Sequence, residues 1–182
     1  MSFEIPVIDL APWWNGSTSD RESVAQQVRA AGHEVGFFQI LNHQVSDDLR
    51  QSALTWMDRF FNLATSDKEH VVPGDGTYRG YTGRKTESFA YTVGDVRPAD
   101  LVEAFVIGSD DVTGVRGSAH HAHHPNIWPN LDGFQRDVWN YYCATRTLSQ
   151  TLGDIAALAL GLPDDFFATR LDEAVVTMRM NW

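Results

Sequence analysis

The sequence predicts a protein of the α+β class, and three observations support this. Apolar residues recur at helical spacing in long stretches, whereas short β-type runs open and close the chain. The 182 residues are 43% hydrophobic, which suits a folded domain with a real core. Helical and strand patterns are partly segregated along the chain, which favours α+β over a doubly wound parallel sheet.

The first quarter of the chain predicts two strands around a helix. The run "IPVIDL" (residues 5–10) has the composition of a short strand. Ser19, with Glu22 three residues later, has the spacing of a capping box and predicts the start of a helix. Gly36 is expected to end this helix, and "FFQIL" (37–41) to form the next strand.

The middle of the chain predicts helices, then a loop, then strands. Ser46 is expected to open a second helix, and Ser66 a short third one. The glycine-rich segment 73–83 is expected to be a loop. The runs "ESFAYTV" (87–93) and "LVEAFVIG" (101–108) are typical of strands.

The last third contains the strongest periodic signal in the chain. Between residues 134 and 162, apolar positions alternate at spacings of four and three, which predicts one long helix with a nearly continuous buried stripe. "AVVTMRMNW" (174–182) is expected to be a closing strand. The predicted stripe consists of Phe134, Val138, Tyr141, Thr145, Leu148, Leu152, Ile155, Ala159 and Leu162.

Composition excludes some partners. The formal net charge is −10 and no basic patch is evident, so we expect no nucleic-acid binding. The N-terminus lacks the pattern of a signal peptide, and the most apolar run, "IAALALGL", is too short to cross a bilayer, so we expect no membrane association. Cys143 is the only cysteine, which fits a cytoplasmic location.

A series of short motifs, in order along the whole chain, resembles the N-terminal region of the isopenicillin N synthase-like family. The family consists of non-haem iron(II) oxygenases, most of them 2-oxoglutarate-dependent. One departure is Gln44, which replaces the glycine that usually follows "NH" in the family. The motifs are "IPVIDL", "AGHEVGFFQILNHQVSDDL", "FFNLATSDKE", "RGYTG", "ESF", "NIWP" with "LGL", and "MRMNW".

The resemblance implies a single unit made of three parts. Residues 1 to about 110 would form the dioxygenase-type N-terminal region, and 111–163 a loop and the long helix. Residues 174–182 would be the first of the strands of a double-stranded β-helix (jelly roll), on which the long helix packs. In the family the iron ligands, a His-x-Asp pair and a distal His, follow this strand, so the jelly roll is expected to be incomplete here.

The metal ligands of the family have no counterpart within the 182 residues. A facial triad for iron(II) needs two imidazoles and one carboxylate, and none of the seven histidines has Asp or Glu two residues later. The cluster "HHAHH" (120–124) is expected to be a solvated loop that binds metal only adventitiously. We therefore predict no catalytic and no metal-binding residue in this chain. Iron(II) and 2-oxoglutarate are expected in the complete enzyme, and no cofactor on this chain alone.

Three residues are candidates for binding, all implied by the resemblance. Arg79 and Tyr81 lie in the segment that covers the barrel mouth in relatives, so they are predicted to bind the substrate. Asn181 matches an asparagine that approaches the cosubstrate in relatives. It shares the polar side of the closing strand with Thr177 and Arg179.

Two functions of different class remain open. In the first, the chain is the N-terminal part of an oxygenase that oxidises a small organic molecule, inactive by itself. In the second, it is a non-catalytic binding or interaction protein built on a degenerate oxygenase half. In the first case a C-terminal half is missing from the chain, whereas in the second the last strand would present an unpaired edge that a dimer could cover.

Overall fold

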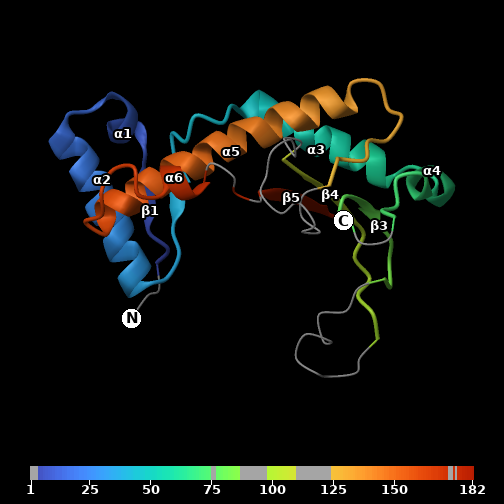
Figure 1. Cartoon of the computed structure of the whole chain (residues 1–182), viewed down its shortest axis with the longest axis horizontal. Helices are drawn as coiled ribbons and strands as arrows, with labels where there is room; N and C mark the ends of the chain where they lie inside the picture. Colours follow the sequence, from blue (N-terminus) through green and yellow to red (C-terminus); the bar gives the residue numbers. More distant parts are fainter. Residues whose placement is uncertain (1–3, 75–76, 87–97, 110–123, 172–173, 175) are drawn as a thin grey trace. The chain divides into compact units, whose positions relative to one another are not determined.

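The structure is a computed structural model, and it describes residues 4–74, 77–86, 98–109, 124–171, 174 and 176–182 (Figure 1). The chain divides into two compact units. The first consists of Met1–Asp47 and Cys143–Ala174, and the second of Asp48–Tyr142 and Val175–Trp182. The mixed helix-and-strand architecture that the sequence predicts is confirmed.

The first unit contains a two-stranded parallel sheet covered by helices. Strand β1 (Val7–Asp9) pairs with β2 (Gln39–Leu41), so that Ile8 lies beside Ile40. These two isoleucines face a core that is built with helix α2 (Thr18–Glu34) and the second part of helix α5 (Phe134–Ala159). Two short helices, α1 (Ala11–Asn15) and α6 (Ala168–Leu171), complete the unit.

The start of α2 differs from the prediction in detail. Ser17 caps the helix, and Asp20 closes the capping box, instead of Ser19 and Glu22. Ser17 Oγ accepts a hydrogen bond from the Asp20 amide, while the Asp20 carboxylate accepts one from the Ser17 amide at 2.8 Å. The prediction is wrong by two residues because an aspartate replaces the usual glutamate of the motif. Gly36 ends the helix as expected, with a φ of +92°.

The first and second motifs, "IPVIDL" and "AGHEVGFFQILNHQVSDDL", are joined at Asp9. Its Oδ1 accepts hydrogen bonds from the Ala11 amide at 2.8 Å and from Asn42 Nδ2 at 2.7 Å. These two bonds lower the pKa of Asp9 below its ordinary value, the Ala11 amide contributing most. The end of β1 is thus tied to the turn that follows β2.

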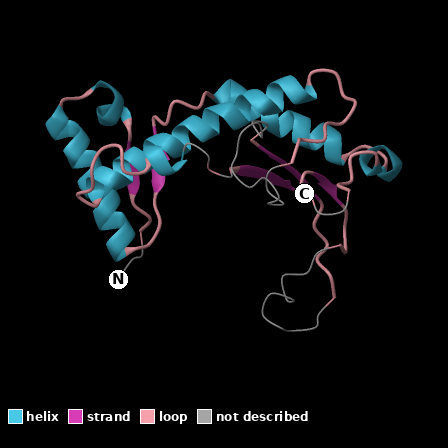
Figure 2. Cartoon of the chain, in the orientation of Figure 1, coloured by secondary structure: helices cyan, strands magenta, loops and turns pink. Residues whose placement is uncertain are grey.

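The second unit contains a three-stranded antiparallel sheet in the order β3-β4-β5 (Figure 2). The strands are β3 (Gly80–Thr82), β4 (Ala104–Gly108) and β5 (Thr177–Asn181). Strand β3 falls within the segment 73–83 that was predicted to be a loop. The expected strands at 101–108 and 174–182 are confirmed, whereas the expected strand at 87–93 lies outside the described residues.

Helices α3 (Asp47–Phe61) and α4 (Thr65–Glu69) precede this sheet. The third helix exists as expected, but its N-cap is Ala64, and Ser66 makes no capping bond. In Figure 1, α3 runs beside the first part of α5, and Trp56 joins the two helices. Its indole Nε1 donates to Asp137 Oδ2 at 2.8 Å, and its ring meets Phe134 edge-on.

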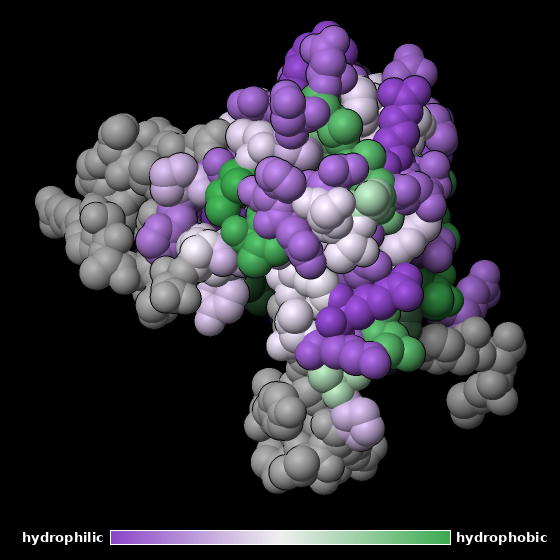
Figure 3. Space-filling view, turned by 90° about the vertical axis from the view of Figure 1, so that its right-hand side faces the viewer, coloured by the Kyte–Doolittle hydropathy of each residue, from purple (hydrophilic) through white to green (hydrophobic). Residues whose placement is uncertain are grey.

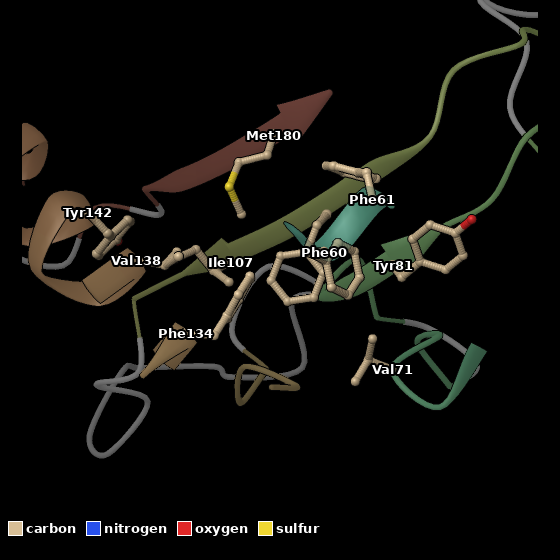
Figure 4. Close-up of a cluster of buried hydrophobic side chains, with 10 residues drawn as sticks. Phe60, Phe61, Val71, Tyr81, Ile107, Phe134, Val138, Tyr142 and Met180 are labelled. Carbon is tan, nitrogen blue, oxygen red and sulfur yellow. The ribbon is translucent and has the colours of Figure 1, made fainter. Parts of the chain in front are cut away.

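The core of the second unit is aromatic (Figure 4). Phe60 of α3 is fully buried and contacts the rings of Phe61, Tyr81, Phe105 and Phe134 at centroid distances of 4.9 to 5.9 Å. The long helix that the periodicity predicts is therefore confirmed, and its first part supplies this core. The buried stripe shifts at two positions, because Tyr142 and Thr151 are buried rather than the predicted Tyr141 and Leu152.

On the side seen in Figure 3, the coloured hydrophobic residues form small patches among hydrophilic ones. Within the described residues, no helix has the length and apolar character needed to traverse a bilayer.

Candidate functional site

The sheet of the second unit has two faces of different chemistry, and β4 shows which residues belong to each. Phe105 pairs with Tyr81 on one side and Met180 on the other, and all three face the aromatic core. Because side chains alternate along a strand, their neighbours point to the opposite face. On that second face Ala104 pairs with Asn181, and Val106 with Arg179. We call the second face the polar face; its β5 members are Thr177, Arg179 and Asn181.

The polar residues of β5 are exposed, whereas Met180 between them is buried. Arg179 Nε donates a hydrogen bond to Asn181 Oδ1 at 2.7 Å. The bond engages the amide oxygen of Asn181, so the amide nitrogen is the donor of this side chain. It belongs to a residue bonded to a guanidinium that carries a permanent charge. An anion with carboxylate oxygens suits this pair of groups.

Arg79 reaches the same face from the other end of β4. Although it is charged, it is only 2% exposed. A Cβ placed on Gly108 would collide with the Arg79 guanidinium, so the guanidinium occupies the space where a side chain of residue 108 would lie. Gly108 pairs with Thr177, and Ala104 pairs with Asn181. These two pairs are four residues apart along β4. At about 3.4 Å per residue, the guanidinium and Asn181 lie at positions about 14 Å apart along the strand.

Tyr81 lies on the opposite face, away from the other two candidates. Figure 4 shows its ring beside Phe60, with its hydroxyl directed away from the aromatic cluster. The side chain is 4% exposed, and its hydroxyl donates to Glu103 Oε2 at 2.9 Å. Burial, together with the bond to the Glu103 carboxylate, raises the pKa of Tyr81 to about 12. The structure therefore brings Arg79 and Asn181 to one face and places Tyr81 behind it.

Glu103 is the centre of a buried ionic network that contains Tyr81. Lys68 Nζ, from α4, contacts Glu103 Oε2 at 2.5 Å and donates to the Phe61 carbonyl at 2.9 Å. Arg84 Nε approaches Glu103 Oε1 at 3.0 Å. Burial opposes ionisation of this carboxyl, but the hydrogen bonds from Lys68 and Tyr81 and the positive charges of Lys68 and Arg84 prevail, and its pKa lies below the ordinary value. The network fixes α4, β3 and β4 to one another.

A cavity of about 480 Å³ lies beside this network. Tyr81, Arg84 and Glu103 line it together with Val72 and Pro73. The cavity is of the size that small-molecule sites have.

Asn126, from the "NIWP" motif, bonds to β4 beyond Gly80, the first residue of β3. Its Oδ1 accepts from the Gly108 amide, and its Nδ2 donates to the Gly108 carbonyl, both at 2.8 Å. Glu103 and Trp182 exchange backbone hydrogen bonds, so the backbone groups of Glu103 face β5. Because this direction alternates along a strand, the backbone groups of Ala104, Val106 and Gly108 face the β3 side. The side-chain amide thus replaces the backbone of a missing strand residue.

Sequence reasoning missed Lys68, Glu103 and the role of Asn126. A signal for Glu103 was present, since a single charged residue inside an apolar strand, as in "LVEAFVIG", requires a buried partner. No comparable signal identified Lys68 as that partner, because α4 contains two acidic residues and no apolar pattern.

The described residues do not form an iron site. Among them, no three His, Cys, Asp or Glu side chains gather closely enough to hold a metal ion. Of the histidine cluster, residues 120–123 lie outside the described part of the chain. The donor set required by a facial triad is therefore not supplied by the described residues, whereas Arg179 and Asn181 on the polar face suit a carboxylate group.

Known proteins resemble this chain over nearly its whole length. It is 28% identical over 179 residues to the 2-oxoglutarate-dependent dioxygenase thnC of Trichoderma harzianum, covering 97% of this chain and 54% of that protein. It is 30% identical over 186 residues to the validamycin A dioxygenase of Streptomyces hygroscopicus subsp. limoneus, covering 100% of this chain and 50% of the relative. The chain thus spans about half the length of these curated relatives.

Solved structures share the fold. A full-length Neurospora crassa protein, solved in complex with alpha-KG, superposes with a TM-score of 0.81 at 22% identity, over 97% of this chain and 53% of that one. A 2OG-Fe(II) oxygenase family protein from Caulobacter crescentus superposes with a TM-score of 0.82 at 23% identity, over 99% and 56%.

A family model supplies the remaining evidence. The model described as "non-haem dioxygenase in morphine synthesis N-terminal" matches residues 5–131, which is more than half of the chain. With the motifs, the fold and the relatives in agreement, the chain belongs to the family of non-haem dioxygenase N-terminal regions.

Proposed function

We propose that this chain is the N-terminal part of an iron(II)- and 2-oxoglutarate-dependent oxygenase that oxidises a small organic molecule. The membership of the family carries the proposal. The named relatives support it, since they are 2-oxoglutarate-dependent dioxygenases and the chain covers about half of each. The alternative of a non-catalytic interaction protein has no comparable support.

The iron ligands of the proposed enzyme lie outside these 182 residues. No histidine here is followed by Asp or Glu two positions later, and no suitable ligand group gathers among the described residues. Iron would supply the oxidising chemistry when bound, and the present chain would contribute the walls of the site. The 182-residue chain alone is accordingly expected to be inactive.

Asn181 is the proposed contact for the cosubstrate. It is exposed on the polar face, and Arg179 is bonded to it. A carboxylate of 2-oxoglutarate would accept a hydrogen bond from the amide and would be attracted by the guanidinium.

Arg79 and Tyr81 remain the proposed substrate contacts, with different parts to play. The Arg79 guanidinium lies over Gly108 on the polar face, where it would attract an anionic or strongly polar group. The Tyr81 hydroxyl is occupied by Glu103, so Tyr81 would contribute its ring to the wall of the adjoining cavity.

The experiment compares two polypeptides, the 182-residue chain and its natural extension past Trp182. Each is incubated with ferrous iron, ascorbate and 2-oxoglutarate, and succinate is measured. Succinate is expected from the extended polypeptide only, and Asn181→Ala should raise its KM for 2-oxoglutarate. Succinate from the 182-residue chain, or none from the extended polypeptide with any small-molecule substrate tried, would contradict the proposal.

A further inference from the structure

The small parallel sheet of the first unit has an apolar face that the described residues do not cover. Ile8 and Ile40 point into the core, whereas Val7 of β1 and Leu41 of β2 point the other way and are 51% and 53% exposed. Ile5 and Phe37, two residues before Val7 and Gln39, are also exposed. We call Ile5, Val7, Phe37 and Leu41 the outer patch.

The face remains mainly apolar although it also has two polar residues, Asp9 and Gln39. Asp9 pairs with Leu41 in the register, but its carboxylate is engaged locally by the Ala11 amide and Asn42. Gln39, which pairs with Val7, is the other polar member. Large exposed side chains are therefore mainly apolar here, on both strands.

Such a face is unusual for a parallel sheet. Parallel sheets are normally covered on both sides, because their strands are apolar on both faces. A sheet of two strands is also too small to be stable without packing partners. Within the described part of the chain, helices α2 and α5 pack against the face that carries Ile8 and Ile40. The sequence thus provides the second face with apolar side chains that require a cover.

We propose that the outer patch is the docking surface for the polypeptide that follows these 182 residues in the complete oxygenase, an inference that rests on the proposed function. The length of the relatives supports this occupant. The chain matches relatives over 97% to 100% of its own length, yet it spans only 50% to 54% of theirs. Because the matching family model is that of an N-terminal region, the remaining half of such a protein follows the matched part.

The character of the patch also favours a permanent partner within one chain. The four side chains of the patch are uncharged and are branched or aromatic, and the charged neighbour Asp9 is bonded locally to the Ala11 amide. Interfaces of this composition resemble the core of a domain rather than a transient contact. A second copy of this chain is the other apolar occupant, and the test below distinguishes the two.

The test introduces lysine into the patch in both polypeptides, the 182-residue chain and its natural extension past Trp182. Val7→Lys and Leu41→Lys are made singly and together, and the melting temperature is measured. We expect little change in the 182-residue chain, where these positions face water. We expect a loss of about 5 °C or more for the double variant in the extended polypeptide, since lysine would be buried there. Leu160→Lys, at an exposed leucine outside the patch, is the matched control and should change neither polypeptide.

Each other outcome overturns the inference. Equal losses in both polypeptides would mean that the patch packs within the first unit. No loss in either, or a natural polypeptide that stops at Trp182, would mean that no following segment covers it. A fall in mass from dimer to monomer, seen by light scattering with the lysine variants, would identify a second copy as the occupant.

Succinate release by the unmodified extended polypeptide separates this inference from the proposed function. If succinate is released but the lysine substitutions leave the melting temperature of the extended polypeptide unchanged, the docking surface alone is overturned. Selective destabilisation of the extended polypeptide without succinate release would retain the docking surface and contradict the proposed function.

Discussion

This chain departs from the pattern of its family at single residues, and the departure at Gln44 is the most informative. Its φ is 63°, in the left-handed region where residues other than glycine, asparagine and aspartate are disfavoured. Asn42 nearby has a φ of 53°, which an asparagine tolerates. The glycine that usually follows "NH" in the family is thus explained by the backbone, and Gln44 adopts the same conformation at a cost.

Replacing Gln44 with glycine should therefore stabilise the protein. We expect Gln44→Gly to raise the free energy of unfolding by about 1 kcal/mol, measured by urea denaturation. Gln26→Gly, at an exposed position within α2, should lower it by about 1 kcal/mol, because glycine is unfavourable inside a helix. Equal losses from the two substitutions would contradict the assignment of strain to residue 44.

Tyr81 should make the stability depend on pH in the alkaline range. Its pKa in the folded protein is about 12, above the ordinary value of 10, because burial and Glu103 disfavour the phenolate. The contribution of the neutral hydroxyl is thus complete below pH 10 and is lost as the pH rises from 10 through 12. We expect the wild type to lose about 2 kcal/mol more than Tyr81→Phe between pH 9.5 and pH 11.5. Denaturation curves at pH 9.5 and 11.5 measure it, and parallel losses in the two proteins would rule it out.

At the scale of elements, the side chain of Asn126 acts as part of the sheet. Asn126→Ala leaves the Gly108 amide and carbonyl without these partners, which should lower the free energy of unfolding by about 2 to 3 kcal/mol. Asn140→Ala removes the same amide from an exposed position on α5 and should have little effect. Similar results for both variants would show that the bonds to Gly108 contribute nothing to stability.

Elements with a strong local signal were the ones that the sequence could predict. The period of α5, the cap residue Gly36 and the alternation of β5 all appear in the folded protein. Helix α1 was missed, although Pro12 in its first turn is a known signal for a helix start. Strand β3 was missed because its three residues, Gly-Tyr-Thr, form a strand only by pairing with β4, which is distant in sequence.

The candidate site was less predictable than the fold. Alternation along β5 placed Asn181 beside Arg179 from the sequence alone. Sequence spacing suggests that Arg79 and Tyr81, two residues apart, share a face. Gly80 between them has a φ of +104°, and they serve different faces of the sheet. Long-range partners such as Lys68 and Glu103 leave no local trace that would reveal their pairing.

At the scale of the whole molecule, the histidine cluster should be separable from the metal centre. None of its histidines belongs to a His-x-Asp pair, so the proposed iron site does not use them. Replacing His120, His121, His123 and His124 together by alanine is expected to leave succinate release by the extended polypeptide unchanged. The same variant should lose adventitious binding to nickel resin. Loss of succinate release in the otherwise folded variant would assign the cluster to the catalytic metal.

The amide of Asn126 has a consequence beyond its contribution to stability. An open strand edge invites any extended peptide to add itself to the sheet, which is a common first step towards aggregation. At Gly108 both backbone groups are already engaged by Asn126, so an incoming strand finds no bonding partner there. One short side chain thereby blocks the growth of the sheet at a point where its own third strand does not reach.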